Sequence, residues 1–312
     1  MIDRETGYRA ADRLSEMVRD NNFLLHVLSR FDIAYGFGDA SAGSVCARNQ
    51  VHTPTFLAVC NLISGYPYDI ESVDLASLIS YLRHAHRSIL EITLPHIRHH
   101  LVEGIGYTED GKIGLMLMRF LDEYTAEVRN HMDHEDQVVF SHAEQLINGE
   151  TPGEKFSGYI ADHKPMSQKL RELKDIFIYH YSQRDNDRLS AVLFDIILCE
   201  RDLSTHFDVE NKLFIPLISR LERRKGADTA APVRNNKAEQ QTRLGEREKE
   251  IIHYVAKGLS NKEISDKLCL SAHTVATHRR NICAKLDIHS ASGLTLYAIV
   301  NHLVDINEIS PK

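Results

Sequence analysis

Two short stretches of the chain carry histidine and glutamate one helical turn apart. The stretch RNHMDHEDQVVF holds His131 and Glu135, and the stretch STHFDVENKLF holds His206 and Glu210. A step of four residues on an α-helix turns by about 400°, so the two members of each pair project from nearly the same side, about 6 Å apart along the axis. One metal ion can therefore contact both members of a pair.

Long helices are needed to hold these pairs, and the apolar pattern predicts four of them. Apolar residues recur at helical spacing over about 71–101, 113–148, 155–182 and 188–224, and clusters of Gly, Pro, Asn and Asp separate the stretches. Each stretch would span roughly 40–55 Å at about 1.5 Å per residue, which suits an up-down bundle with short connections. We expect residues 67–224 to form an all-α four-helix bundle.

The other two helices of this bundle also bring histidines to an inward-facing stripe. These are His84 or His86 on the first helix and His163 on the third. Helices that donate imidazole and carboxylate into a bundle interior are the way carboxylate-bridged di-iron centres are built. A single inward histidine is more often a hydrogen-bonded core residue, so the metal interpretation depends on all four helices contributing.

Not every histidine of the bundle fits this pattern. His84 and His86 are two residues apart and lie on different faces, so only one of them is expected to be a ligand. We expect the surplus histidines to lie on the surface or to support the ligands, since we find no ligand spacing among them: His99, His100, His134, His142 and His180.

The totals describe a protein of two domains without an obvious membrane segment. The chain has 312 residues, of which 43% are apolar, and it has no apolar run long enough to span a membrane. The stretch MIDRETGYRAADRLSEM lacks the apolar core that a signal peptide needs. We therefore expect a cytoplasmic protein. The net charge of −7 excludes a uniformly basic coat but not a local DNA-binding face. The cysteines suggest reduced, mostly buried thiols: Cys46, Cys60, Cys199, Cys269 and Cys283.

A small N-terminal module and a C-terminal domain flank the predicted bundle. Residues 1–66 resemble a small module of shorter helices around the Gly-rich turn YGFGDASAGSV, and residues 225–242 have the polar composition of a linker. In 243–312, four short helical patterns follow, and Ser260 and Ser271 are cap-type residues at the starts of the second and third. A tight helix pair with a polar face on its second member is the geometry of a major-groove reader.

The bundle region resembles a known family. The two H-x3-E motifs, with ADHKPM between them and RHAHRSILEITLP before them, are similar to hemerythrin-like di-iron domains of the repair-of-iron-centres (RIC) type. This resemblance implies two iron ions bridged by the two glutamates. It implies six protein ligands: His86, His131, Glu135, His163, His206 and Glu210. The chain departs from RIC proteins at Ala34 and Tyr35, where those proteins carry adjacent cysteines.

The C-terminal segment resembles the LuxR-type helix-turn-helix domain over nearly its whole length, from GEREKEII to NICAKL. The resemblance implies that 274–286 is the recognition helix and that the domain acts as a homodimer on double-stranded DNA. Gly245 replaces a usual Thr, and Ala276 stands where many members have Lys. The implied DNA-binding residues are Thr277 and Arg280 at the bases, and Lys262, Thr274 and Arg279 near phosphates.

An open metal site joined to a DNA reader favours a transcription regulator rather than an enzyme. We expect it to sense oxygen, nitric oxide or redox state through the di-iron centre. The alternative is an RIC-type protein that repairs iron centres or handles nitric oxide or peroxide, with an attached DNA-binding domain. A further alternative is a DNA-binding protein whose bundle is a metal-free dimerisation module.

Overall fold

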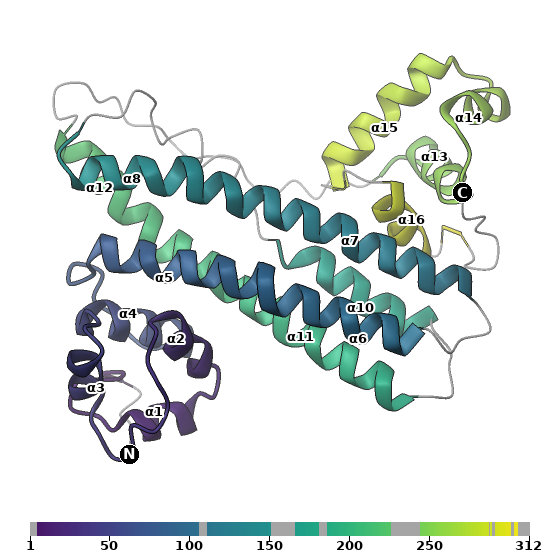
Figure 1. Ribbon diagram of the computed structural model, residues 1–312. Coiled ribbons are helices and arrows are strands. Elements are labelled where there is room, and N and C mark those ends of the chain that lie inside the picture. The colour runs from purple at the N-terminus through teal and green to yellow at the C-terminus, as the bar shows by residue number, and fades with distance from the viewer. Residues whose placement is uncertain are drawn as a thin grey trace. The chain divides into compact units, whose positions relative to one another are not determined.

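The computed structural model describes residues 5–105, 111–150, 166–180, 186–225, 244–286, 288, 291–300 and 303–304. Every regular element in these ranges is helical and no strand occurs in them, so the all-α prediction is confirmed (Figure 1). None of the described helices is both long and apolar enough to cross a membrane. The helices group into two compact units, one of Met1–Thr93, Val128–Met166 and Arg201–Ala231, the other of Leu94–Glu127, Ser167–Glu200 and Pro232–Lys312.

The first unit begins with four short helices. They are α1 (Leu14–Asp20), α2 (Leu24–Arg30), α3 (Ala42–Arg48) and α4 (Thr53–Ser64). The Gly-rich turn lies between α2 and α3, where Gly36 and Gly38 adopt φ values of 87° and 55° that other residues rarely adopt. Cys46 and Cys60 are buried free thiols of this module, and burial raises the pKa of Cys46 to about 11.

Three long helical rods and one shorter helix follow. The first rod is α5 (Leu75–Arg87), the π-helical turn η1 (Ser88–Thr93) and α6 (Leu94–Ile105). The second is α7 (Gly111–His134), η2 (Glu135–Val139) and α8 (Phe140–Ile147). Helix α10 (Gln168–His180) comes next, and the last rod is α11 (Asn186–Val209), η3 (Glu210–Phe214) and α12 (Ile215–Lys225). These elements follow the four predicted stretches, except that residues 151–165 lie outside the described part.

Within the second unit, polar contacts join four helices in a closed ring. Helix α6 contacts α7 through Arg98 and Asp122, at 2.6 Å, and helix α10 contacts α7 through Lys169 and Glu127. The ring is completed by α10 to α11, where Arg171 Nε lies 2.9 Å from Glu200, and by α6 to α11, where His100 lies 2.7 Å from Asp195. Each helix thus has two neighbours, as in a four-helix bundle.

Within the first unit, the small N-terminal module shares its core with the rods. Apolar residues of α2 and α4 pack in one cluster with α5, α8, η3 and α12, including Phe56, Tyr81, Phe140 and Phe214. The 1–66 module is thus built onto the end of the rods rather than around a core of its own.

A buried ion pair also fastens this module to the last rod. Arg30, the last residue of α2, donates from Nη2 to Asp202 Oδ2 on α11 at 2.6 Å, and both side chains are almost fully buried. The Arg30 guanidinium also lies 5.9 Å from the ring centroid of Tyr81. Burial lowers the pKa of Arg30, but the charge of Asp202 outweighs burial and raises the pKa above its usual value.

The C-terminal helices form a compact core of their own residues. They are α13 (Glu246–Ala256), α14 (Asn261–Leu268), α15 (Ala272–Leu286) and α16 (Ala291–Val300). Ser260 and Ser271 cap α14 and α15 as predicted, because their hydroxyl oxygens accept from the N–H groups of Glu263 and Thr274. Gly245 has no side chain to cap α13, but its own N–H donates to Glu248 at 2.8 Å.

Removing one partner of the Arg30–Asp202 pair should strongly destabilise the first unit. Asp202→Ala leaves a buried guanidinium without its carboxylate, so we expect the free energy of unfolding to fall by about 3–5 kcal/mol. Asp208→Ala, which removes an exposed carboxylate of the same helix, is the matched control and should cost under about 1 kcal/mol. Urea unfolding followed by circular dichroism measures both, and equal losses would contradict the role given to this pair.

Candidate metal centre and DNA-binding helix

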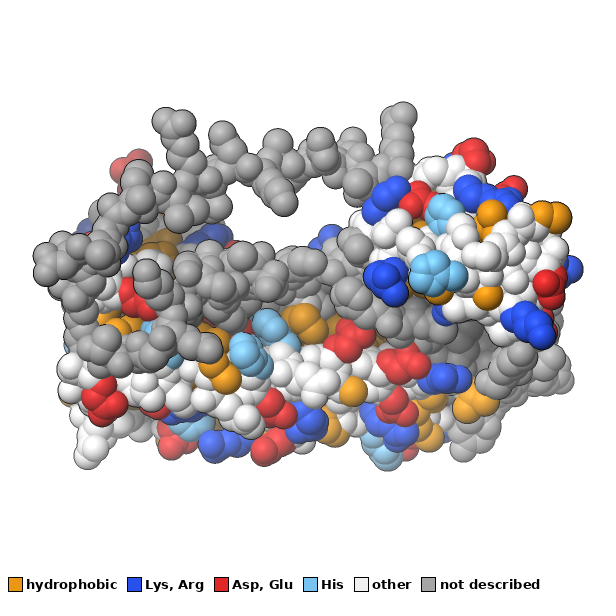
Figure 2. Space-filling view, turned by 90° about the horizontal axis from the view of Figure 1, so that it is seen from above, with side chains coloured by type: hydrophobic (Ala, Val, Ile, Leu, Met, Phe, Trp, Pro, Cys, Tyr) orange, Lys and Arg blue, Asp and Glu red, His pale blue; other side chains and the backbone are white. Residues whose placement is uncertain are grey.

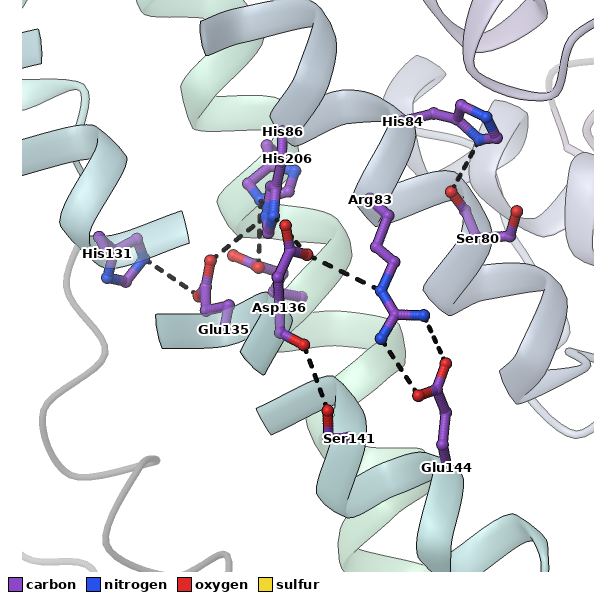
Figure 3. Close-up of polar contacts among 11 residues, drawn as sticks. Ser80, Arg83, His84, His86, His131, Glu135, Asp136, Ser141, Glu144 and His206 are labelled. Carbon is purple, nitrogen blue, oxygen red and sulfur yellow. Dashed lines mark hydrogen bonds and ion pairs between the residues drawn. The ribbon is translucent and has the colours of Figure 1, made fainter. Parts of the chain in front are cut away.

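Four buried side chains from three helical rods converge in the first unit. They are His86 of α5, Glu135 of η2, His206 of α11 and Glu210 of η3, and each offers a ligand atom within 4.8 Å of those of the others. Their exposures are between 0% and 4%, so the cluster is closed to bulk water. His86 Nε2 lies 3.1 Å from His206 Nε2 and 3.3 Å from Glu135 Oε2 (Figure 3).

The geometry separates His86 from His84. His86 points into the cluster, whereas His84 is turned away and its Nδ1 lies 2.9 Å from the backbone oxygen of Ser80 (Figure 3). A step of two residues on a helix reverses the direction of the side chain, so only one of the two histidines can face the interior. The structure therefore brings His86, and not His84, to the candidate site.

The remaining two expected ligands differ in what the structure says of them. His131 Nε2 lies 3.0 Å from Glu135 Oε1, on the side of that carboxylate opposite to His86, and its side chain is 24% exposed (Figure 3). Glu135 thus offers one oxygen to His86 and the other to His131. His131 is not part of the compact group of four, and His163 lies outside the described residues.

Both glutamates begin a π-helical turn. In η2 the N–H of Phe140 bonds to the carbonyl of Glu135, and in η3 the N–H of Ile215 bonds to that of Glu210, so each bond spans five residues instead of four. Single π-turns inside α-helices are rare and occur often at functional sites. The expected His-Glu step is kept on the preceding turn, where His206 Nε2 lies 3.1 Å from Glu210 Oε1.

Several residues that hold His86 were not predicted from the sequence. Asp136 Oδ1 lies 3.0 Å from His86 Nδ1, and Arg83 faces both Asp136, at 3.9 Å, and Glu144 (Figure 3). The ring of Phe140 stacks on His86 with 5.4 Å between centroids. A carboxylate at Nδ1 turns Nε2 toward the cluster, as supporting carboxylates do for metal-binding histidines. Only the position of Asp136 next to Glu135 could have suggested it.

The charges of the cluster fit a divalent cation. Burial alone lowers the pKa of His86, but hydrogen bonds with Asp136 and Glu135 and the charges of Glu135 and Glu210 outweigh burial and raise the pKa to about 9. Buried carboxylates are stabilised by positive charge close to them. A divalent cation would supply two such charges at one point and displace the proton of His86. Imidazole with carboxylate suits iron, manganese or zinc.

The expected DNA-binding residues all lie on α14 and α15. Lys262 and Arg280 are exposed, whereas Arg279 donates to Asn261 Oδ1 at 2.6 Å and joins the two helices. Thr274 takes part in the Ser271 cap, and the Thr277 hydroxyl donates to the carbonyl of His273. In Figure 2, acidic and basic side chains are interspersed on the described part of the surface. The expectation of DNA binding therefore depends on α14 and α15 and not on a uniformly basic surface.

Comparisons with known proteins agree with this division. Residues 77–218 match the hemerythrin HHE cation binding domain, and residues 242–298 match the luxR family of bacterial regulatory proteins. No solved structure was found to match the chain.

Several known proteins are similar to part of the chain. A Fimbriae Z protein of Escherichia coli K12 is 49% identical over 63 residues, which is 20% of this chain and 30% of that protein. The transcriptional regulatory protein LiaR of Bacillus subtilis is 36% identical over 97 residues, 31% of this chain and 41% of that protein. The oxygen regulatory protein NreC of Staphylococcus haemolyticus is 44% identical over 62 residues, 20% of this chain and 29% of that protein.

The chain thus spans less than half the length of these three relatives. The two family matches cover separate segments, and the candidate cation ligands and the helix-turn-helix fall within one match each. The chain therefore combines a hemerythrin HHE cation-binding domain with a C-terminal DNA-binding domain of the luxR family of bacterial regulatory proteins.

Proposed function

We propose that this protein is a transcription regulator that senses oxygen, nitric oxide or redox state through a di-iron centre. The observation that carries the proposal is the closed group of two imidazoles and two carboxylates in a chain that also has a helix-turn-helix domain. The proposed ligands are those expected from the sequence: His86, His131, Glu135, His163, His206 and Glu210.

The donor set supports iron in preference to a structural zinc site. None of the described cysteines belongs to the cluster, and the carboxylate of Glu135 faces histidines on both sides. When bound, a di-iron centre with six protein ligands supplies redox chemistry and open positions for a small ligand. His131 is the partly exposed member of the proposed ligand set among the described residues, with a side chain 24% exposed.

The rod that carries two of the proposed ligands also contacts the N-terminal module. His206 and Glu210 belong to the rod that also carries Asp202, whose buried pair with Arg30 holds the N-terminal module. A change in the position of this rod would therefore alter packing in the first unit. We propose that such a change reaches a homodimer of helix-turn-helix domains and alters how two recognition helices engage a two-fold operator. We also propose domain boundaries that divide the chain into 1–66, 67–224, 225–242 and 243–312.

The resemblance of short segments to regulators supports the same class of function. LiaR is named a transcriptional regulatory protein and NreC an oxygen regulatory protein, so these two relatives support a regulator. The alternative, an RIC-type protein that handles nitric oxide or peroxide, uses the same donor set. This alternative predicts that the protein turns over nitric oxide or peroxide and that its affinity for DNA does not change.

The side chain that orients His86 should matter for metal affinity. Asp136→Asn removes the carboxylate at Nδ1, so we expect iron affinity to fall by about 10–100-fold. Asp133→Asn, an exposed position on the adjoining turn, is the matched control and should leave the affinity unchanged. Competition with a chromophoric chelator under anaerobic conditions measures both. Equal affinity of the Asp136 variant and the parent would mean that His86 is not a ligand held by Asp136.

Signalling should appear as a change in operator affinity. An operator is first selected from random duplexes with the full-length protein, and fluorescence anisotropy then gives its affinity for the anaerobic iron-loaded protein. Oxygen or nitric oxide should shift this affinity by about 5–150-fold, the usual range of coupling between sites. The Glu135→Ala/Glu210→Ala variant should bind the operator but not respond. An unchanged affinity of the loaded parent, with gas consumed, would favour the RIC-type alternative.

Base reading should depend on the exposed arginine of α15. Arg280→Ala should weaken binding to the selected operator by about 1–3 kcal/mol while sparing iron content, because one base-reading side chain contributes about that much discrimination. Lys249→Ala, which removes a cation from α13 instead, is the control and should change specific binding little. If both variants bind as the parent does, Arg280 does not read bases.

A further inference from the structure

A second cluster of possible metal ligands lies in the other unit, outside the candidate di-iron site. His96 and His100 are one turn apart on α6, and Asp195 faces them from α11. Their ligand atoms all lie within 4.8 Å of one another. We propose that His96, His100 and Asp195 form a separate zinc site with two imidazole nitrogens and one carboxylate oxygen as protein ligands.

The three side chains converge on one point. His100 Nδ1 lies 2.7 Å from Asp195 Oδ2, and His96 Nε2 lies 3.8 Å from the same oxygen. The two imidazole rings are only 4.0 Å apart between centroids. In a tetrahedral zinc site with bonds of about 2.0–2.2 Å, neighbouring ligand atoms are roughly 3.3–3.5 Å apart. The observed separations bracket this value, so small side-chain rotations bring all three atoms to one ion.

The donor set selects the metal class. Two histidines four residues apart on a helix, with a carboxylate from a second helix, leave one position of a tetrahedral ion open to water. Imidazole and carboxylate suit zinc and the neighbouring transition metals, whereas magnesium and calcium prefer oxygen ligands alone. Zinc accepts such a set because it has no preferred d-electron geometry, and Fe(II) also binds two histidines with one carboxylate, so zinc serves as the probe ion for this site.

A simple hydrogen bond does not account for the whole arrangement. His96 and His100 are neighbours because four residues separate them on one helix, but a hydrogen bond between His100 and Asp195 involves only two of the three groups. His96 is about half exposed, so its side chain has room to turn into solvent, yet it lies against His100 and faces the same oxygen. A cation shared by all three groups explains why two imidazoles and one carboxylate meet there.

The site differs in character from the buried cluster. Its three side chains are between 23% and 53% exposed, so an ion there can exchange with solvent. Zinc would also strengthen the contact between α6 and α11, where His100 and Asp195 form the polar pair of the bundle ring. His100 was expected to lie on the surface or to support the ligands, but His96 stands four residues before it, at ligand spacing.

Zinc binding by the full-length chain tests the proposal. Equilibrium dialysis against zinc should give one bound equivalent fewer for His96→Gln/His100→Gln than for the parent. Asp195→Asn, nearly identical in shape to the parent residue, should also lose that equivalent. His99→Gln is the matched control, because His99 is exposed on the same helix and faces Glu103 instead. Iron bound at the other cluster does not affect this difference.

A second readout excludes loss through misfolding. Circular dichroism without metal should be the same for all four proteins, and zinc should raise the thermal unfolding temperature of the parent and of His99→Gln above that of the two site variants. Retention of the full zinc content by either His96→Gln/His100→Gln or Asp195→Asn would overturn the proposal.

Discussion

Two carboxylates closed off from water among imidazoles are the constraint on which the candidate centre depends. Glu135 and Glu210 are at most 1% exposed, and each faces an imidazole nitrogen at 3.0–3.3 Å. Burying a carboxylate costs several kcal/mol unless positive charge or hydrogen-bond donors lie beside it, and a bound cation would supply charge that balances both carboxylates. The match to a cation-binding domain family has a physical basis in this balance.

The helices around the cluster are built to hold it in place. Asp136 orients His86 from one side and Phe140 packs on its ring from another, while the π-turns begin at the two glutamates. Asp202 pairs with Arg30 on the same rod that carries His206, so the ligand helix is fixed to the N-terminal module. A regulator that responds at its metal site needs such connections, because a local change must move packed elements to have an effect elsewhere.

Helical spacing in the sequence was enough to predict most of the fold and part of the candidate site. The rods and the four C-terminal helices follow from apolar periodicity, and the two His-Glu pairs follow from the four-residue step, since both are local properties of a helix. The choice between His84 and His86 required knowledge of which face is inward. Asp136, Arg83 and the approach of Asp195 to His96 depend on contacts between helices distant in sequence, and no local pattern encodes them.

The central claim is that imidazoles and carboxylates of separate rods hold two iron ions in one interior. X-ray absorption at the iron edge of the anaerobically purified full-length protein tests it most directly. We expect only nitrogen and oxygen neighbours, outer-shell scattering from imidazole rings and a second iron nearby, all absent when Glu135 and Glu210 are replaced together. Sulfur neighbours, isolated iron, or a spectrum that the double replacement leaves unchanged would contradict the account.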